Sequence, residues 1–162
     1  GNASTFNDSE GVLMAEISAL VNDSSLREIA LSDGSSSNRI ELRYGAESNR
    51  IQFVARSGGV VQASISNESN NIILNNKVVI KYKLNDFALW VNGFELGIDD
   101  SGSTPIGLSE LAFDDGSGAN DFYGNTKQIQ YFDSALNDSD LEKLTSWTSF
   151  TAMANALNYT II

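Results

Sequence analysis

The sequence predicts an all-β protein, built as an antiparallel sandwich or barrel. Apolar and polar residues alternate with a period of two over most of the chain, which is typical of strands that bury one face. Turn-forming residues interrupt this alternation roughly every 8–12 residues. A helical pattern is confined to the last part of the chain. Many short strands at this spacing are typical of sandwiches and barrels.

The segment 77–98 shows the pattern most clearly. Val78 and Ile80 point to one side of an extended strand, and lysines alternate with the apolar residues toward its end. A second alternating run leads into Asn92-Gly93, and a third follows it. An Asn-Gly pair between alternating runs favours a type I′ hairpin, because that turn needs a positive φ at both central residues. The segment therefore predicts three neighbouring antiparallel strands.

The remaining strands follow from the same alternation, each bounded by Asn, Asp, Ser or Gly. In chain order, the predicted strands span residues 12–19, 27–32, 39–44, 50–57, 60–66, 77–83, 87–92, 94–96, 108–113 and 127–132.

One or two short helices are expected at the C-terminal end. Asp138 or Ser139 can cap a helix, and acidic residues favour its positive N-terminal end. Leu141 and Leu144 lie three residues apart, as on one face of a helix. Helical spacing in the tail allows a second short helix containing Phe150, Met153, Ala154 and Leu157.

Length and composition narrow the possible functions. The 162 residues suit one domain, expected over residues 11–145, with a lead-in over 1–10 and a tail over 146–162. The chain has neither cysteine nor histidine, which excludes disulfides and Ser-His or Cys-His catalysis. A net charge of −11 disfavours nucleic acid and anionic membrane surfaces as partners. No apolar run is long enough to predict insertion into a membrane.

The ordered segments resemble the laminin-G-like, concanavalin A-like jelly-roll domains, as found in tail-fibre and adhesin proteins of bacterial viruses. The most specific part is Gly124, followed by the strand 127–132 and the sequence SALNDSDL over 134–141. The resemblance covers residues 10–145 and is carried by EGVLMAEIS, REIALSDG, NRIELRYG, IQFVARSGG, VVIKYKLNDFALWVNG, LSELAFDDGSG and YGNTKQIQYFDSALNDSDLEKL. It implies two antiparallel sheets packed face to face in a jelly-roll sandwich.

The resemblance implies a recognition function. Members of these families mostly bind glycans or proteins, and some relatives with the same fold are glycosidases. The first hypothesis is a non-catalytic carbohydrate-binding or receptor-recognition module on a virion fibre or adhesin, at the virion surface or outside the cell. The second is a structural module that oligomerises, as a trimer, through the tail. The third, a glycosidase, lacks support because no E-x-D-x-x-E strand is present.

The loop 114–125 is the candidate ligand site. It combines aromatic residues that could stack on a sugar with polar side chains that could bind hydroxyl groups: Asn120, Asp121, Phe122, Tyr123 and Asn125. Trp90 points away from the apolar side of its strand, so it is either an exposed platform or a core residue beneath a second layer. By contrast, Glu41 and Glu47 lie among arginines, which indicates a solvated charged face of a sheet.

The same loop is the candidate metal site. Laminin-G-like domains often hold one calcium ion at the sandwich rim, and Asp114 and Asp115 could supply carboxylate oxygens for Ca²⁺. Asp, Gly and Ser are also ordinary turn residues, and the loop lacks the spacing of an EF-hand.

Overall fold

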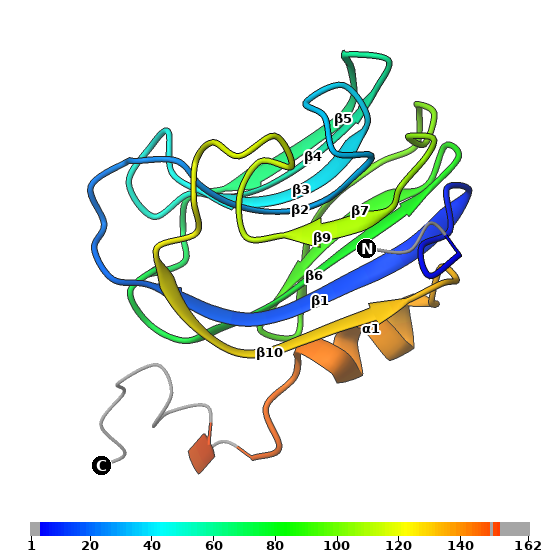
Figure 1. Cartoon of the computed structure of the whole chain (residues 1–162). Coiled ribbons are helices and arrows are strands. Elements are labelled where there is room, and N and C mark those ends of the chain that lie inside the picture. The colour runs from blue at the N-terminus through cyan, green and yellow to red at the C-terminus, as the bar shows by residue number, and fades with distance from the viewer. Residues whose placement is uncertain (1–3, 150, 153–162) are drawn as a thin grey trace.

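The computed structural model describes residues 4–149 and 151–152. Its strands form two five-stranded antiparallel sheets, in the orders β10-β1-β6-β7-β8 (the first sheet) and β5-β4-β3-β2-β9 (the second sheet). The two sheets pack face to face (Figure 1), which confirms the predicted jelly-roll sandwich. The elements are β1 (Glu10–Ala19), β2 (Arg27–Ser32), β3 (Arg39–Tyr44), β4 (Ile51–Ser57), β5 (Val60–Asn67), β6 (Asn76–Lys83), β7 (Phe87–Val91), β8 (Phe94–Asp99), β9 (Glu110–Ala112), β10 (Gly124–Phe132) and α1 (Asp138–Thr145).

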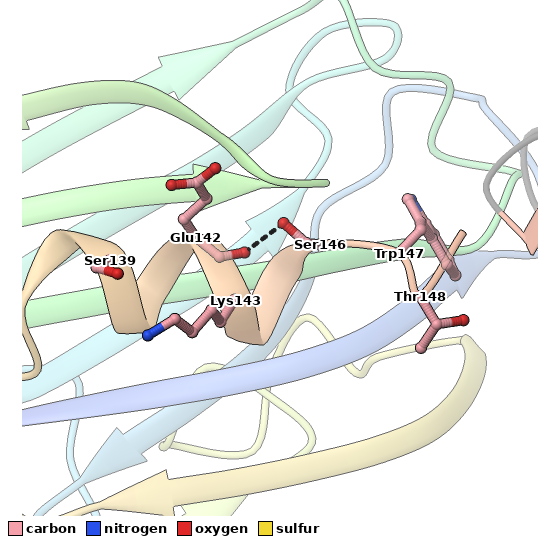
Figure 2. Close-up of a pocket in the computed structure, with 6 residues that line it drawn as sticks. All are labelled: Ser139, Glu142, Lys143, Ser146, Trp147 and Thr148. Atoms are coloured by element: carbon pink, nitrogen blue, oxygen red, sulfur yellow. Dashed lines mark hydrogen bonds between the residues drawn. The ribbon is translucent and has the colours of Figure 1, made fainter. Parts of the chain in front are cut away.

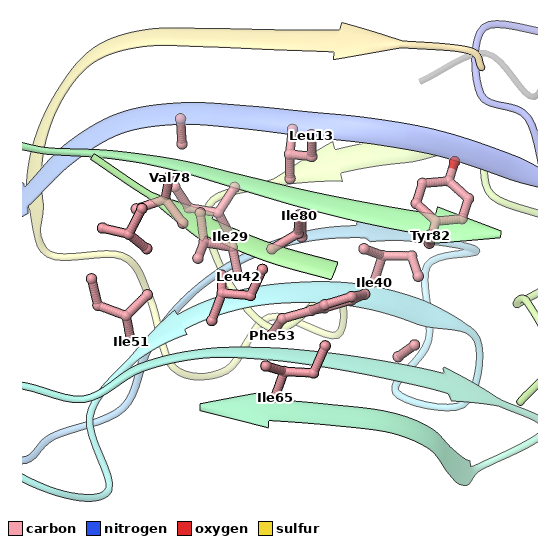
Figure 3. Packing of buried hydrophobic residues seen from close by; sticks show 14 of the residues in the cluster. Leu13, Ile29, Ile40, Leu42, Ile51, Phe53, Ile65, Val78, Ile80 and Tyr82 are labelled. Carbon is pink, nitrogen blue, oxygen red and sulfur yellow. The ribbon is translucent and has the colours of Figure 1, made fainter. Parts of the chain in front are cut away.

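The core lies between the sheets. Leu13, Ile80 and Tyr82 point from the first sheet toward Leu42 and Phe53 on the second (Figure 3), and all five are buried. Each of these residues occupies the apolar position of an alternating pattern. The period of two therefore determines which side chains form the core.

The first sheet also buries its outer face. Val79, Ala88 and Trp90 point away from the core and pack with Leu141 of α1 in a second apolar cluster. Figure 1 shows α1 lying along this outer face. Strand β7 is therefore apolar on both sides, because each side faces a packed layer, whereas β6 adds only Val79 among outward lysines.

The segment 77–98 folds as predicted. Asn92 and Gly93 have φ values of 53° and 89°, as a type I′ turn requires. The predicted strand over 108–113 is shorter in the structure, where only Glu110–Ala112 pair with β2. Conversely, β8 continues to Asp99 beyond its predicted end.

Both ends of the domain differ in detail from the predictions. The cap of α1 is Asn137, whose side-chain oxygen accepts a hydrogen bond from the Asp140 amide, rather than Asp138 or Ser139. The lead-in is fastened to the sandwich, because Asp8 accepts hydrogen bonds from the backbone amides of Gly107 and Leu108.

The second predicted helix lies almost wholly outside the described residues. Within the part of the chain that the structure describes, no helix combines the length and the apolar character needed to cross a membrane.

Truncating a core leucine tests the packing. Leu13 has no exposed surface, whereas Leu84 is 62% exposed. We expect Leu13→Ala to lower the free energy of unfolding by about 2–5 kcal/mol, through lost burial and the cavity that remains. Urea denaturation measures this loss. The matched variant Leu84→Ala should change stability by less than about 0.5 kcal/mol, and equal losses in the two variants would contradict the assigned core.

Candidate functional site

Arginines and lysines lie in different parts of the fold. Every arginine lies in the second sheet or in the turn that leads into β4, and every lysine lies in β6, β10 or α1. Arginine presents a planar fork of donors that suits carboxylates, whereas lysine presents a compact charge. The second sheet therefore carries the side chains that are suited to bind a planar anion.

The outer face of the second sheet gathers these groups in cross-strand rows. Strand pairing aligns Glu28, Arg43 and Gln52 in one row, and places Glu41 in the next, with Arg39 and Arg56 beyond it. The strands of this sheet bow so that their outer face is the concave one (Figure 1). In the described part of the chain α1 covers only the first sheet, so this face has no helix over it.

A chain of ion pairs crosses this face from the loop after β9. Arg39 Nη1 lies 3.0 Å from Asp115 Oδ2 and also donates to the Asp115 carbonyl at 2.6 Å. Arg39 Nη2 lies 2.9 Å from Glu41 Oε1, and Arg56 Nε lies 3.6 Å from Glu41 Oε2. The Glu41 side chain has no exposed surface, so its charge depends on these two guanidinium groups.

A second set of contacts surrounds Glu28. Its Oε1 accepts a hydrogen bond from Asn120 Nδ2 at 3.2 Å and lies 3.7 Å from Arg43 Nη1. Arg43 Nε donates to Gln52 Oε1 at 3.0 Å, and Gln52 Nε2 donates to Ser64 Oγ at 2.9 Å. These contacts hold the Arg43 guanidinium between β2 and β4.

The carboxyl groups of Glu28 and Glu41 interact directly. Burial raises the pKa of Glu28 most, and the hydrogen bond and the negative charge of Glu41 raise it further, to about 8 against an ordinary value of 4.5. The positive charges of Arg43 and Arg39 lower it by less. Burial and the neighbouring Glu41 carboxyl therefore favour the protonated form of Glu28 at neutral pH.

Two guanidinium groups of this network reach the surface. The side chains of Arg43 and Arg56 are 17% and 27% exposed, against 9% for Arg39. Among the described residues, the Arg56 guanidinium makes only its ion pair with Glu41. Arg43 and Arg56 therefore keep donors available to a ligand.

This buried network corrects the expectation of a solvated charged face. Glu47 is exposed as expected, but Glu41 is fully buried and Arg39 nearly so. The site is hard to recognise in the sequence because each charged residue, taken alone, has the pattern of a solvent-facing strand position. One signal was present: neighbouring strands each place Glu, Arg or Gln on the polar side.

The candidate metal ligands, Asp114 and Asp115, accept hydrogen bonds from within their own loop. Burial alone would raise the pKa of Asp115, but hydrogen bonds from Ser117, Ala119 and Arg39 outweigh it and hold the pKa below its usual range. Asp114 accepts a hydrogen bond from the Gly116 amide at 2.6 Å. Among the described residues, no group of three or more acidic side chains could hold a metal ion. The Asp115 carboxylate faces the Arg39 guanidinium at 3.0 Å, and calcium binding stays a prediction.

The candidate ligand residues do not form one site. Asn120 joins the arginine face through Glu28, whereas Phe122 packs beside Tyr44 of the core, with ring centroids 6.0 Å apart. Tyr123 is 66% exposed at the rim, and its hydroxyl donates to Asp121 at 3.0 Å, which raises the Tyr123 pKa.

Two further candidates lie on the first sheet. Asn125 donates to Ser18 Oγ at 3.3 Å, on the neighbouring strand β1. Trp90 is only 7% exposed, beneath α1, so the alternative of a core residue beneath a second layer is confirmed and the exposed platform is wrong. Its indole packs in the second apolar cluster because α1 covers that face.

A hollow lies at α1, on the opposite side of the molecule from the arginine face. It has a volume of about 340 Å³ and is lined by exposed residues of α1 together with Trp147 (Figure 2). The Lys143 amine lies 3.2 Å from Asp140, and Ser146 Oγ donates to the Glu142 carbonyl. Trp147 is packed under Lys77, whose amine lies 4.9 Å from the ring centroid. No guanidinium lines this hollow, so the arginine face is the stronger candidate.

Comparisons with known proteins support the fold. No protein-family model and no curated protein match the sequence. Among solved structures, the chain is similar to the CBM40 module of the Ruminococcus gnavus IT-sialidase bound to α2,3-sialyllactose, with TM-score 0.70, 14% identity and coverage of 88% of this chain and 86% of that chain.

Two further structures share the fold. The chain is similar to the Streptococcus pneumoniae NanB sialidase, with TM-score 0.70, 16% identity and coverage of 87% of this chain and 24% of the sialidase. It is also similar to CBM66 from Bacillus subtilis, with TM-score 0.53, 12% identity and coverage of 76% and 75%. At these identities the likeness shows the fold alone.

The buried proton of Glu28 makes stability depend on pH. The folded state keeps this proton up to about pH 8, whereas the unfolded chain loses it near 4.5. The free energy of unfolding should therefore fall as pH rises from about 4.5 to 8, by at most about 1.4 kcal/mol per pH unit, with no further loss from this group above 8. We expect Glu28→Gln to flatten this slope in urea denaturation. The control Glu47→Gln should retain it, and a wild-type slope of opposite sign would contradict the assignment.

Proposed function

We propose that the protein is a carbohydrate-binding module that holds an acidic sugar on the outer face of the second sheet. The observation that carries this proposal is the pair of partly exposed guanidinium groups, Arg43 and Arg56, beside the buried and paired charges of Arg39 and Glu41. The likeness to the CBM40 module supports it, because that module was crystallised with sialyllactose.

The chemistry of the face suits a sugar carboxylate. A guanidinium can donate two parallel hydrogen bonds to one carboxylate, which gives orientation as well as energy. Ser64 and Ser66 lie on the same side of β5, where Ser64 is exposed, and hydroxyl groups at these positions suit hydrogen bonds to sugar hydroxyls. The whole chain carries a charge of −11. On this face, by contrast, an anion meets arginines.

Binding without hydrolysis fits the same geometry. A glycosidase needs two carboxyl groups on either side of the scissile bond, roughly 5–9.5 Å apart. Here Glu28 and Glu41 lie on neighbouring strands, and neither is exposed by more than 1%, so neither faces a bound sugar. Buried carboxyl groups cannot flank a scissile bond, and we propose a non-catalytic role.

The assembly and the location of the protein stay predictions. A place on a virion fibre or adhesin, a trimeric state and an extracellular location are expectations from the sequence resemblance. So is the alternative of a structural module that assembles through residues 146–162.

Titration calorimetry with α2,3-sialyllactose, and with lactose as the neutral control, tests the proposed function. We expect wild-type protein to bind the acidic sugar and not lactose. Arg43→Ala should weaken binding by at least about tenfold, because it removes a charge-assisted contact. Arg43→Lys should bind almost as weakly as Arg43→Ala, since an ammonium group cannot reproduce the fork of donors on a guanidinium.

The matched control is Lys83→Ala, which removes an equal charge from the first sheet, where Lys83 pairs with Glu10 at 3.0 Å. Its affinity should equal that of the wild type. If no acidic glycan binds, or if Arg43→Ala and Lys83→Ala behave alike, the proposal fails. The solution mass, with and without residues 146–162, would then test the structural module. Repeating the titration in calcium and in chelator tests the metal prediction.

A further inference from the structure

The Arg43 guanidinium has one carboxyl partner within ion-pair distance in the described part of the chain. That partner is Glu28, whose Oε1 lies 3.7 Å from Arg43 Nη1. The remaining contact of the guanidinium is neutral, because Arg43 Nε donates to the Gln52 side-chain oxygen. The protonation state of Glu28 therefore decides whether Arg43 has an internal anionic partner.

Glu28 is built into a site that favours its neutral form. Its side chain is 1% exposed, and Glu41 on the neighbouring strand places a second buried carboxyl group close to it. Two carboxylates in such contact repel each other unless one of them carries a proton. Glu41 already pairs with two guanidinium groups, so the proton belongs on Glu28. The charged groups around Glu28 are Arg39, Glu41 and Arg43 on β3, Arg56 on β4, Asp115 in the loop after β9, and Glu110 on β9.

We propose that neutral Glu28 keeps Arg43 available to the acidic sugar, and that loss of the Glu28 proton releases the sugar. This inference rests on the proposed function and adds its regulation. Once ionised, Glu28 becomes an internal carboxylate that competes with the ligand carboxylate for the same guanidinium. It also repels that carboxylate directly. Glu28 is thus a positioning residue that acts through Arg43, without contact to the sugar.

The direction of the pH effect on affinity follows from the linkage between proton binding and sugar binding. The sugar binds the form of the protein that carries the proton, so the apparent affinity falls with the fraction of that form. Above about pH 8, where Glu28 ionises, the dissociation constant should rise by on the order of tenfold per pH unit. The sugar carboxylate stays ionised over this range, since such groups titrate near pH 3–4. The pH dependence therefore belongs to the protein.

The experiment is a pH series of α2,3-sialyllactose titrations, from pH 6.5 to 9.5, on the whole chain. Wild-type affinity should be constant up to about pH 7.5 and then fall. Glu28→Gln cannot ionise, and its amide can still accept from Asn120 and donate to Glu41. This variant should bind as tightly at pH 9.5 as at pH 6.5. The control Glu47→Gln, in an exposed turn, should follow the wild-type curve. Circular dichroism at each pH confirms that all three proteins remain folded.

A second measurement needs no variant. At pH 8 the wild-type protein should take up protons when the sugar binds, which makes the binding enthalpy depend on the ionisation enthalpy of the buffer. Affinity that is constant to pH 9.5, or a Glu28→Gln variant that loses affinity in parallel with the wild type, would overturn the inference and leave the proposed function intact. Absence of binding at every pH would instead overturn the proposed function.

Discussion

The second sheet depends on one buried charge. Glu41 has no exposed surface and lies in a middle strand of that sheet, where an unpaired carboxylate would cost several kcal/mol. Arg39 and Arg56 pair with it, and Arg39 in turn holds Asp115. Because Arg39 and Glu41 lie on β3, Arg56 on β4 and Asp115 in the loop after β9, this network fixes the relative positions of these three segments. Removing either guanidinium would leave a buried charge uncompensated, so the network behaves as a unit.

The two sheets bury their outer faces by different means. The first sheet places Val79, Ala88 and Trp90 beneath α1, and this packing is apolar. The second sheet has charged residues at the corresponding positions and buries them against one another and against a loop. An apolar outer face needs a covering element, whereas a paired charged face stays open to solvent at its edges. The ligand-binding face we propose is therefore the sheet without the helix, where donors can be buried at the base and exposed at the tip.

The fold could be predicted from the sequence, whereas the arrangement of the candidate site could not. Alternation is local, so the inward direction of Ile80 and the outward direction of Val79 could be predicted from their own strand. The burial of Glu41 could not be predicted, because its strand reads R-I-E-L-R-Y, as a half-solvated strand does. Burial here comes from side chains on β2 and β4 and from the loop after β9, and those pairings are long-range. Trp90 could not be decided from its own strand, since an outward aromatic residue is exposed only when no helix returns to cover it.

The distribution of charge also implies that the recognition we propose on this face is short-range. A chain of charge −11 repels anions at a distance, so long-range steering of an acidic sugar is unfavourable. Attraction begins only when the sugar carboxylate comes within reach of the Arg43 fork, where the direct contact outweighs the distant charges. Salt screens the distant repulsion more strongly than a contact at a partly buried guanidinium. Placing the donors on a rigid sheet instead of a mobile loop keeps their orientation fixed before binding, so little entropy is lost in arranging them.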